Sequence, residues 1–100
     1  MRYAYYVYIL CATPFQYDAV KAAANLKTHS VSFAEAEGVF NDPLAVTAED
    51  PDARGEQRFV TIGLGNSRNL LVVVYTERDG EVRLISARRA TLKERKSYEA

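Results

Sequence analysis

The sequence has very few of the residues on which disulfide and metal chemistry depend. Among its 100 residues there is one cysteine, Cys11, and one histidine, His29. A single cysteine excludes an internal disulfide, and these two residues among scattered acids do not have the spacing of zinc ligands. We therefore expect no metal site and no cofactor. A cytoplasmic chain is the simplest interpretation of the low cysteine content.

An excess of charge and a long apolar run are missing as well. The 13 basic residues balance the 13 acidic residues, so the formal net charge is zero, which argues against binding of nucleic acid by the whole surface. The aromatic run from Tyr3 to Leu10 is too short for a membrane span, which requires about 20 apolar residues. It also lacks the charged start and the aliphatic centre of a secretory signal. We expect no association with a membrane.

Residues 1–14 are interpreted as an N-terminal extension of uncertain role. Their aromatic run favours a strand and is closed by Pro14. An edge strand and an extension that arises from an upstream start codon are both open interpretations, and we assign the segment no function. Residues 15–100 form the remaining domain, and a chain of this length can bury a core without metals or disulfides.

The first part of that domain has the pattern of a helix. Asp18 is typical of the residue that caps a helix N-terminus, and the helix is predicted over 19–28. In this alanine-rich segment we expect Val20 and Leu26 to supply the apolar contacts. Asn25 is predicted to lie on the more polar side.

A second helix follows, and the pattern then alternates with the period of strands. Ser32 and Glu35 form a capping box at the start of the second helix, which Asn41-Asp42-Pro43 ends. Strands are predicted near residues 44–48, 58–64, 70–75 and 82–87, besides a short one near 15–17 ahead of the first helix. Thr91 and Glu94 form a capping box for a last helix. The predicted fold is therefore α+β, with two N-terminal helices, a four-stranded antiparallel β-meander and a C-terminal helix.

The pair Asp79-Gly80 predicts a two-residue hairpin turn and so fixes the register of the last two strands. With such a turn, Thr76 faces Arg83 and Val74 faces Ile85. Alternation then predicts one face of the last strand that is formed by Arg83, Ile85 and Ala87.

The charges are segregated along the chain although their sum is zero. From residue 83 to residue 96 one acid, Glu94, accompanies six bases: Arg83, Arg88, Arg89, Lys93, Arg95 and Lys96. Arg88 and Arg89 precede a predicted helix N-terminus, whose free N–H groups favour anions, so a phosphate is a candidate ligand there. A solvated basic helix is the alternative interpretation. The middle of the chain is acidic, with Glu35, Glu37, Asp42, Glu49, Asp50, Asp52 and Glu56.

These residue types suit cleavage of RNA by its own 2′-hydroxyl group. That reaction needs groups that move protons and cations that hold the phosphate in the transition state, and it needs no metal. Histidine can take or give a proton near neutral pH, so His29 is the candidate for proton transfer. We predict that Arg58, Arg83 and Arg88 converge on one concave side of the sheet and hold the phosphate. Lys21, Lys27, Arg89 and Arg95 are candidates for binding the rest of the substrate.

Each candidate has a structural alternative. His29 can cap the last carbonyl groups of its helix. Arg58 can simply be the last residue of a strand face that is otherwise buried. Arg83 can pair with Glu77 or Glu81 across the hairpin.

Four segments resemble, in the same order, the BrnT toxins, which are ribonucleases of type II toxin–antitoxin systems. The segments are Lys21–Phe33, Val39–Leu44, Arg58–Gly63 and Ile85–Thr91, and the resemblance extends over roughly residues 15–99. It implies a fold similar to the RelE toxins and a small cytoplasmic endoribonuclease that cleaves RNA and halts translation. It also implies a BrnA-like antitoxin, whose DNA-binding part represses the shared operon, so that contact with operator DNA is indirect.

The chain departs from the family pattern at three positions. It has Thr28-His29-Ser30 where the family usually has Lys-His-Gly, and Gln57-Arg58 where Glu-Arg is frequent. A serine at position 30 makes a left-handed helix end more costly than glycine does. Two classes of function therefore stay open: an active ribonuclease toxin, and a non-catalytic toxin-fold partner that binds an antitoxin and assists operon repression.

Overall fold

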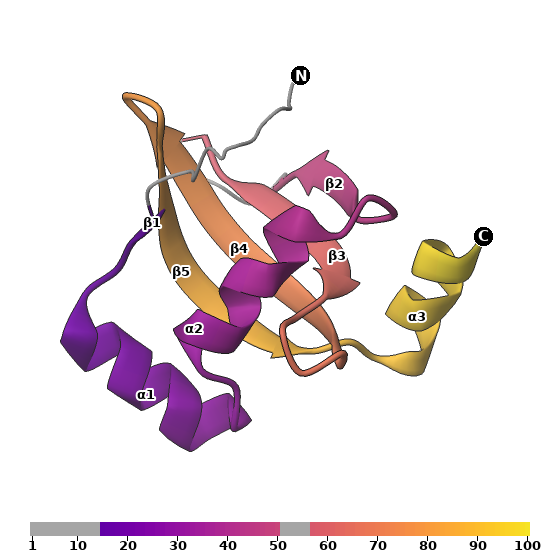
Figure 1. The fold of residues 1–100 in the computed structure, drawn as a ribbon, viewed down its shortest axis with the longest axis horizontal. Helices are drawn as coiled ribbons and strands as arrows, with labels where there is room; N and C mark the ends of the chain where they lie inside the picture. Colours follow the sequence, from indigo (N-terminus) through magenta and orange to yellow (C-terminus); the bar gives the residue numbers. More distant parts are fainter. Residues whose placement is uncertain (1–14, 51–56) are drawn as a thin grey trace.

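The computed structural model describes residues 15–50 and 57–100 of the chain, so the interpretation of residues 1–14 lies outside it. Figure 1 shows the arrangement of its helices and strands. In chain order these are β1 (Phe15–Gln16), α1 (Ala19–His29), α2 (Phe33–Ala36), the 3₁₀ helix η1 (Glu37–Asn41), β2 (Val46–Glu49), β3 (Phe59–Leu64), β4 (Leu70–Arg78), β5 (Glu81–Arg89) and α3 (Leu92–Glu99).

The sheet has five strands in the order β1-β5-β4-β3-β2. The strands β2 to β5 form the predicted antiparallel meander. The prediction of four strands was wrong, because the short strand β1 joins the sheet as a fifth member and runs parallel to β5. Its pairing covers backbone groups at the edge of β5 that would otherwise be open. The fold is α+β with a mixed sheet.

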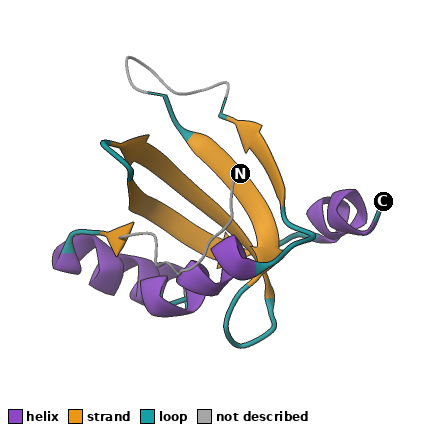
Figure 2. Cartoon of the chain, turned by 45° about the horizontal axis from the view of Figure 1, so that its top comes forward, coloured by secondary structure: helices purple, strands orange, loops and turns teal. Residues whose placement is uncertain are grey.

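Helices cover one face of this sheet, and α3 lies beyond its end (Figure 2). We call the helix-covered side the inner face and the opposite side the outer face. The core on the inner face contains Val31, Phe33, Ala36 and Val39 from the helical layer, packed on Leu71, Val73, Tyr75, Val82, Leu84 and Ala87 of the sheet. Because neighbouring residues of a strand point to opposite faces, these sheet residues also identify which side chains lie on the outer face.

The prediction of which α1 side chains are buried was wrong. Val20 and Leu26 are 76% and 51% exposed, and the buried residue of this helix is Asn25. The Asn25 Nδ2 group donates to the carbonyl groups of Val31 and Ala87, at 2.9 and 2.8 Å, and its Oδ1 accepts from the Ala87 N–H at 3.1 Å. An amide suits this position because it can both donate to the Ala87 carbonyl group and accept from the Ala87 N–H, so neither backbone group is left buried and unpaired.

The predicted caps at Asp18 and at Thr91 are confirmed. The Asp18 side chain accepts from the Val20 N–H, and Thr91 and Glu94 form a reciprocal capping box. Ser30 adopts the left-handed conformation with a φ of 59°, and its N–H donates to the Leu26 carbonyl group. The helix therefore keeps a left-handed end although the residue is serine rather than glycine.

The hairpin between β4 and β5 follows the predicted register only near its turn. Asp79 and Gly80 both have positive φ values, 54° and 79°, as the predicted turn type requires. Thr76 faces Arg83 as predicted. Further along, Val74 pairs with Ser86 and not with Ile85, because a β-bulge interrupts the ladder between Val74 and Tyr75. The predicted face of Arg83, Ile85 and Ala87 was therefore wrong, since Ala87 lies on the inner face with Leu84.

Candidate functional site

Four polar side chains form a row across the outer face at one end of the sheet. The row starts at the residue before β3 and crosses β4, β5 and β1. We call it the arginine row, and its members are Arg58, Thr76, Arg83 and Gln16. Arg83 is a register partner of two other members of the row, namely Thr76 on β4 and Gln16 on β1. Among these residues Arg83 is exposed and Thr76 is buried.

The position of Arg58 follows from its neighbour Phe59. Phe59 pairs with Tyr75, and their rings stack on the inner face with centroids 5.7 Å apart. Arg58 therefore points to the outer face, opposite Thr76 on the next strand. Because adjacent strands lie about 4.8 Å apart, the Cα atoms of Arg58 and Arg83 are separated by about 10 Å. Two guanidinium groups on long side chains can meet at one anion across that gap.

Both arginines of the row have only long contacts within the described part of the chain. The Arg83 Nη2 group donates to Gln16 Oε1 at 3.3 Å. The Arg58 Nη2 atom lies 3.5 Å from Asp50 Oδ2, and the Arg58 side chain is 33% exposed. Contacts at these distances are weak, so the two guanidinium groups can move toward a ligand.

Arg88 lies on the same outer face but is bound to a carboxylate. It faces Val72, four residues along β4 from Thr76, which is about 13 Å away at the usual rise per residue. Its Nη1 and Nη2 groups donate to the two oxygens of Glu94 at 2.8 and 2.7 Å. The hydrogen bond from Arg88, with further hydrogen bonds from Thr91, lowers the pKa of Glu94 to about 2. The anion position that was predicted at the start of α3 is thus filled by Glu94.

His29 lies at the end of α1, away from the arginine row. The chain enters α1 from β1, which pairs beside Arg83, and Asn25 meets the backbone of Ala87 near the far end of β5. His29 is the last residue of α1 and follows Asn25 by one helical turn, so it lies toward the end of β5 that carries Arg88. The structure does not bring His29 together with Arg58 and Arg83.

The candidate substrate-binding residues are all exposed and lie on three different elements. Lys21 and Lys27 lie on α1, and Arg89 is the last residue of β5. Arg95 lies on α3, with its Nη1 atom 3.7 Å from Glu99. In the described part of the chain, Arg83 forms no ion pair with the glutamates at positions 77 and 81, so the structural alternative proposed for it is not realised.

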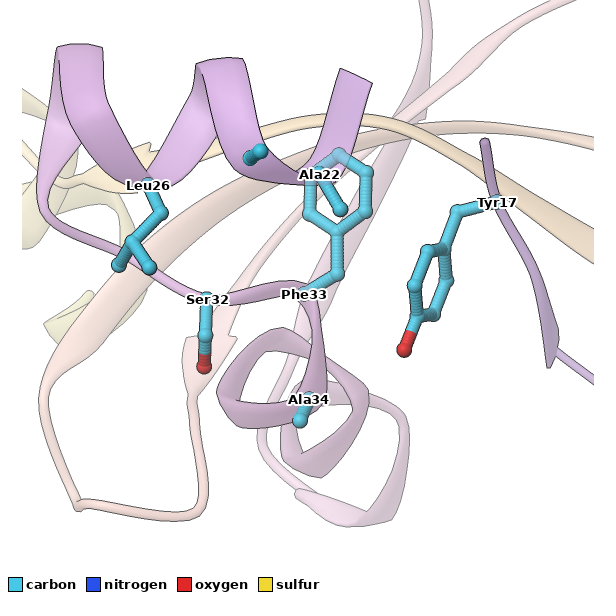
Figure 3. A pocket seen from close by; sticks show the side chains of 7 residues that line it. Tyr17, Ala22, Leu26, Ser32, Phe33 and Ala34 are labelled. Atoms are coloured by element: carbon cyan, nitrogen blue, oxygen red, sulfur yellow. The ribbon is translucent and has the colours of Figure 1, made fainter. Parts of the chain in front are cut away.

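A hollow of 210 Å³ lies between α1 and α2 (Figure 3). It is lined by alanines and by Tyr17, Leu26, Ser32 and Phe33. This lining offers two hydroxyl groups and no charged side chain. It therefore suits an apolar group rather than a phosphate.

Thr76, the residue between the two arginines of the row, was not predicted from the sequence as a site residue. Thr76 is 2% exposed, and its Oγ1 atom has no hydrogen-bond partner. The only sequence signal was the predicted hairpin register, which placed it opposite Arg83. A second missed feature is Asp42, which was predicted only to end a helix. Its Oδ2 atom accepts from the Tyr98 hydroxyl at 2.6 Å and from the Leu64 N–H at 2.9 Å, so it ties α3 to β3.

Neither metal ligands nor membrane spans are found among residues 15–50 and 57–100. No group of three or more His, Cys, Asp or Glu residues there could hold a metal ion. No helix in that part of the chain has the length and the apolar character needed to cross a membrane.

The chain resembles known proteins over most of its length. Residues 17–94 match the family described as the ribonuclease toxin BrnT of type II toxin–antitoxin systems. The fold is similar to the crystal structure of the ribonuclease toxin BrnT of Brucella abortus, with a TM-score of 0.59 and 22% sequence identity. This similarity covers 80% of the chain and 99% of the Brucella protein. No curated protein matches the chain.

Proposed function

Because the chain belongs to the BrnT family of ribonuclease toxins of type II toxin–antitoxin systems, we propose that it is a metal-independent endoribonuclease. It cleaves RNA in the cytoplasm and so inhibits translation. In this reaction the 2′-oxygen of a ribose attacks the adjacent phosphorus and expels the 5′-oxygen of the next nucleotide. The negative charge on the phosphate increases in the transition state, and cations must stabilise it.

The observation that carries this proposal is the shared row of Arg58 and Arg83 on the outer face. Their strand positions allow both guanidinium groups to reach one phosphate, and their contacts to Asp50 and Gln16 are long. Arginine donates to phosphate oxygens in pairs, so it suits a site with no metal ligands. Loss of one such donor typically costs about 100- to 1000-fold in rate.

The test is the cleavage rate of an RNA oligonucleotide by purified protein, together with growth arrest on induced expression. Arg83→Ala should lower the cleavage rate at least about 100-fold and abolish growth arrest. The melting temperature should stay close to that of the wild type, because the Arg83 side chain is exposed. Lys93→Ala, which removes an exposed base of α3 outside the row, is the control. Equal rates for the two variants would contradict the proposed site.

His29 requires a separate test because of its position. A general base must come within hydrogen-bond distance of the proton that it takes, and His29 lies toward the Arg88 end of β5. If the scissile phosphate binds in the arginine row, His29→Ala should change the rate far less than Arg83→Ala. If His29→Ala is the more severe variant, the reaction takes place at the end that carries His29, Arg88 and Arg89.

A second candidate function is favoured by the placement of Arg88 and His29. Arg88 is held by Glu94, and His29 is separated from Arg58 and Arg83. A non-catalytic partner with the toxin fold, which binds an antitoxin and assists operon repression, would be compatible with this separation. Wild-type protein that arrests growth and cleaves RNA in vitro would exclude this candidate.

We further propose that the partner is a BrnA-like antitoxin, which contacts operator DNA on behalf of the complex. Family membership implies an antitoxin. The exposed bases Lys21, Lys27, Arg89 and Arg95 would bind RNA in the free protein. Acidic side chains of the antitoxin would cover them in the complex.

A further inference from the structure

The hydroxyl group of Thr76 is buried without a hydrogen-bond partner in the middle of the arginine row. Thr76 is 2% exposed, and its Oγ1 atom makes no hydrogen bond. A buried polar group without a partner lowers the stability of a folded protein. Valine has the same shape and no hydroxyl group, so a purely structural position on this central strand would be better served by valine.

The neighbouring strand shows how this sheet accommodates a threonine hydroxyl that has only a structural role. Thr61 on β3 is also 2% exposed. Its Oγ1 atom lies 2.8 Å from Thr47 Oγ1 and 3.1 Å from the Tyr75 hydroxyl. The two threonines are thus equally buried, and the hydroxyl group of Thr76 differs in being unpartnered.

The surroundings of Thr76 supply positive charge. Arg83 is its register partner on β5. Arg58 immediately precedes β3, and continuing the ladder by one residue beyond the pair of Phe59 and Tyr75 puts Arg58 opposite Thr76. An anion held by both guanidinium groups would lie over β4, the strand between them. Arg58 would then exchange its contact with Asp50, and Arg83 its contact with Gln16, for the anion.

We propose that the Thr76 hydroxyl group is a third hydrogen-bond donor to the phosphodiester that Arg58 and Arg83 bind. This inference rests on the proposed function, because it assigns a further substrate-binding residue to the same site. In the free protein the hydroxyl group is covered and unpaired. When the two guanidinium groups rearrange around the phosphate, it gains the acceptor that it lacks.

The test compares Thr76→Val, Thr76→Ser and Thr61→Val in melting temperature and in affinity for a 2′-O-methyl RNA oligonucleotide. This probe has no nucleophilic 2′-hydroxyl group, so binding is measured without cleavage. Thr76→Val should raise the melting temperature and weaken binding on the order of tenfold, the effect of losing one hydrogen bond to a charged group. Thr76→Ser should keep the affinity. Thr61→Val should lower the melting temperature and leave the affinity unchanged, since its hydroxyl group has structural partners.

Three outcomes would overturn the inference, and they separate it from the proposed function. If Thr76→Val binds as tightly as the wild type while Arg83→Ala loses affinity, the role of Thr76 is refuted and the arginine site stands. If Thr76→Val lowers the melting temperature, the hydroxyl group already has a partner in the free protein. If wild type and Arg83→Ala bind the probe equally well, the arginine site and the role of Thr76 are both wrong.

Discussion

Replacement of Asn25 by alanine should be among the most destabilising substitutions in this chain. The Asn25 side chain makes three hydrogen bonds, two of them to the backbone of Ala87 and one to that of Val31. Each bond contributes about 1 kcal/mol, and leaving the Ala87 groups buried and unpaired adds roughly 1 to 3 kcal/mol. We therefore expect a loss of roughly 4 to 6 kcal/mol in the free energy of unfolding, a large fraction of the stability of a small domain.

The measurement is urea denaturation followed by far-UV circular dichroism, with Leu26→Ala as the matched control on the same helix. Leu26 is 51% exposed, so its truncation should cost less than about 1 kcal/mol. The two variants distinguish the packing seen in the structure from the packing that the sequence pattern predicted, in which Leu26 makes the apolar contact and Asn25 lies on the polar side of the helix. A larger loss for Leu26→Ala than for Asn25→Ala would refute the packing of α1 on β5.

Three further predictions concern α3, the end of α1 and the partner. The pKa of Glu94 is lowered to about 2. The pairing of Glu94 with Arg88 should therefore stabilise α3 fully at pH values above the ordinary carboxyl pKa, and this stabilisation should be lost as the pH falls from there through about 2. Hydrogen exchange of the α3 amides should show the loss, and Glu94→Gln should remove the pH dependence. Ser30 has a left-handed backbone, so Ser30→Gly should raise the free energy of unfolding by about 1 kcal/mol in urea titrations, and an unchanged value would contradict that strain. The dissociation constant of the antitoxin complex should rise with salt concentration, because surface charges are screened; a constant that is flat between low and high salt would exclude an acidic cover over the basic residues.

The features that could be predicted from the sequence are those decided by neighbouring residues. Asp18 and Thr91 cap their helices through hydrogen bonds to residues two or three positions away. Asp79-Gly80 forms the predicted turn because both residues accept positive φ values. The order of helices and strands follows from the same local patterns.

The features that could not be predicted depend on partners distant in the sequence. The bonds between Asn25 and Ala87 join residues separated by 62 positions, and no local pattern distinguishes this asparagine from one on the surface. The pairing of β1 with β5 is equally remote. In the same way, the charge pattern identified Arg88 as a phosphate ligand, but the geometry of the capping box brings Glu94 into that position.

The β-bulge at Ile85 determines which arginines share a face. Arg83 and Arg88 are five positions apart, so strict alternation would place them on opposite faces of the sheet. The additional residue in β5 shifts the alternation, and Ala87 turns into the core while Arg88 joins Arg83 on the outer face. Bulges commonly redirect side chains near functional sites, and here one additional residue is enough to put Arg88 on the same face as Arg83. Isoleucine is a residue type common in regular strands, so the sequence does not indicate a bulge at Ile85. That Arg83 and Arg88 share a face is seen only in the register of the sheet.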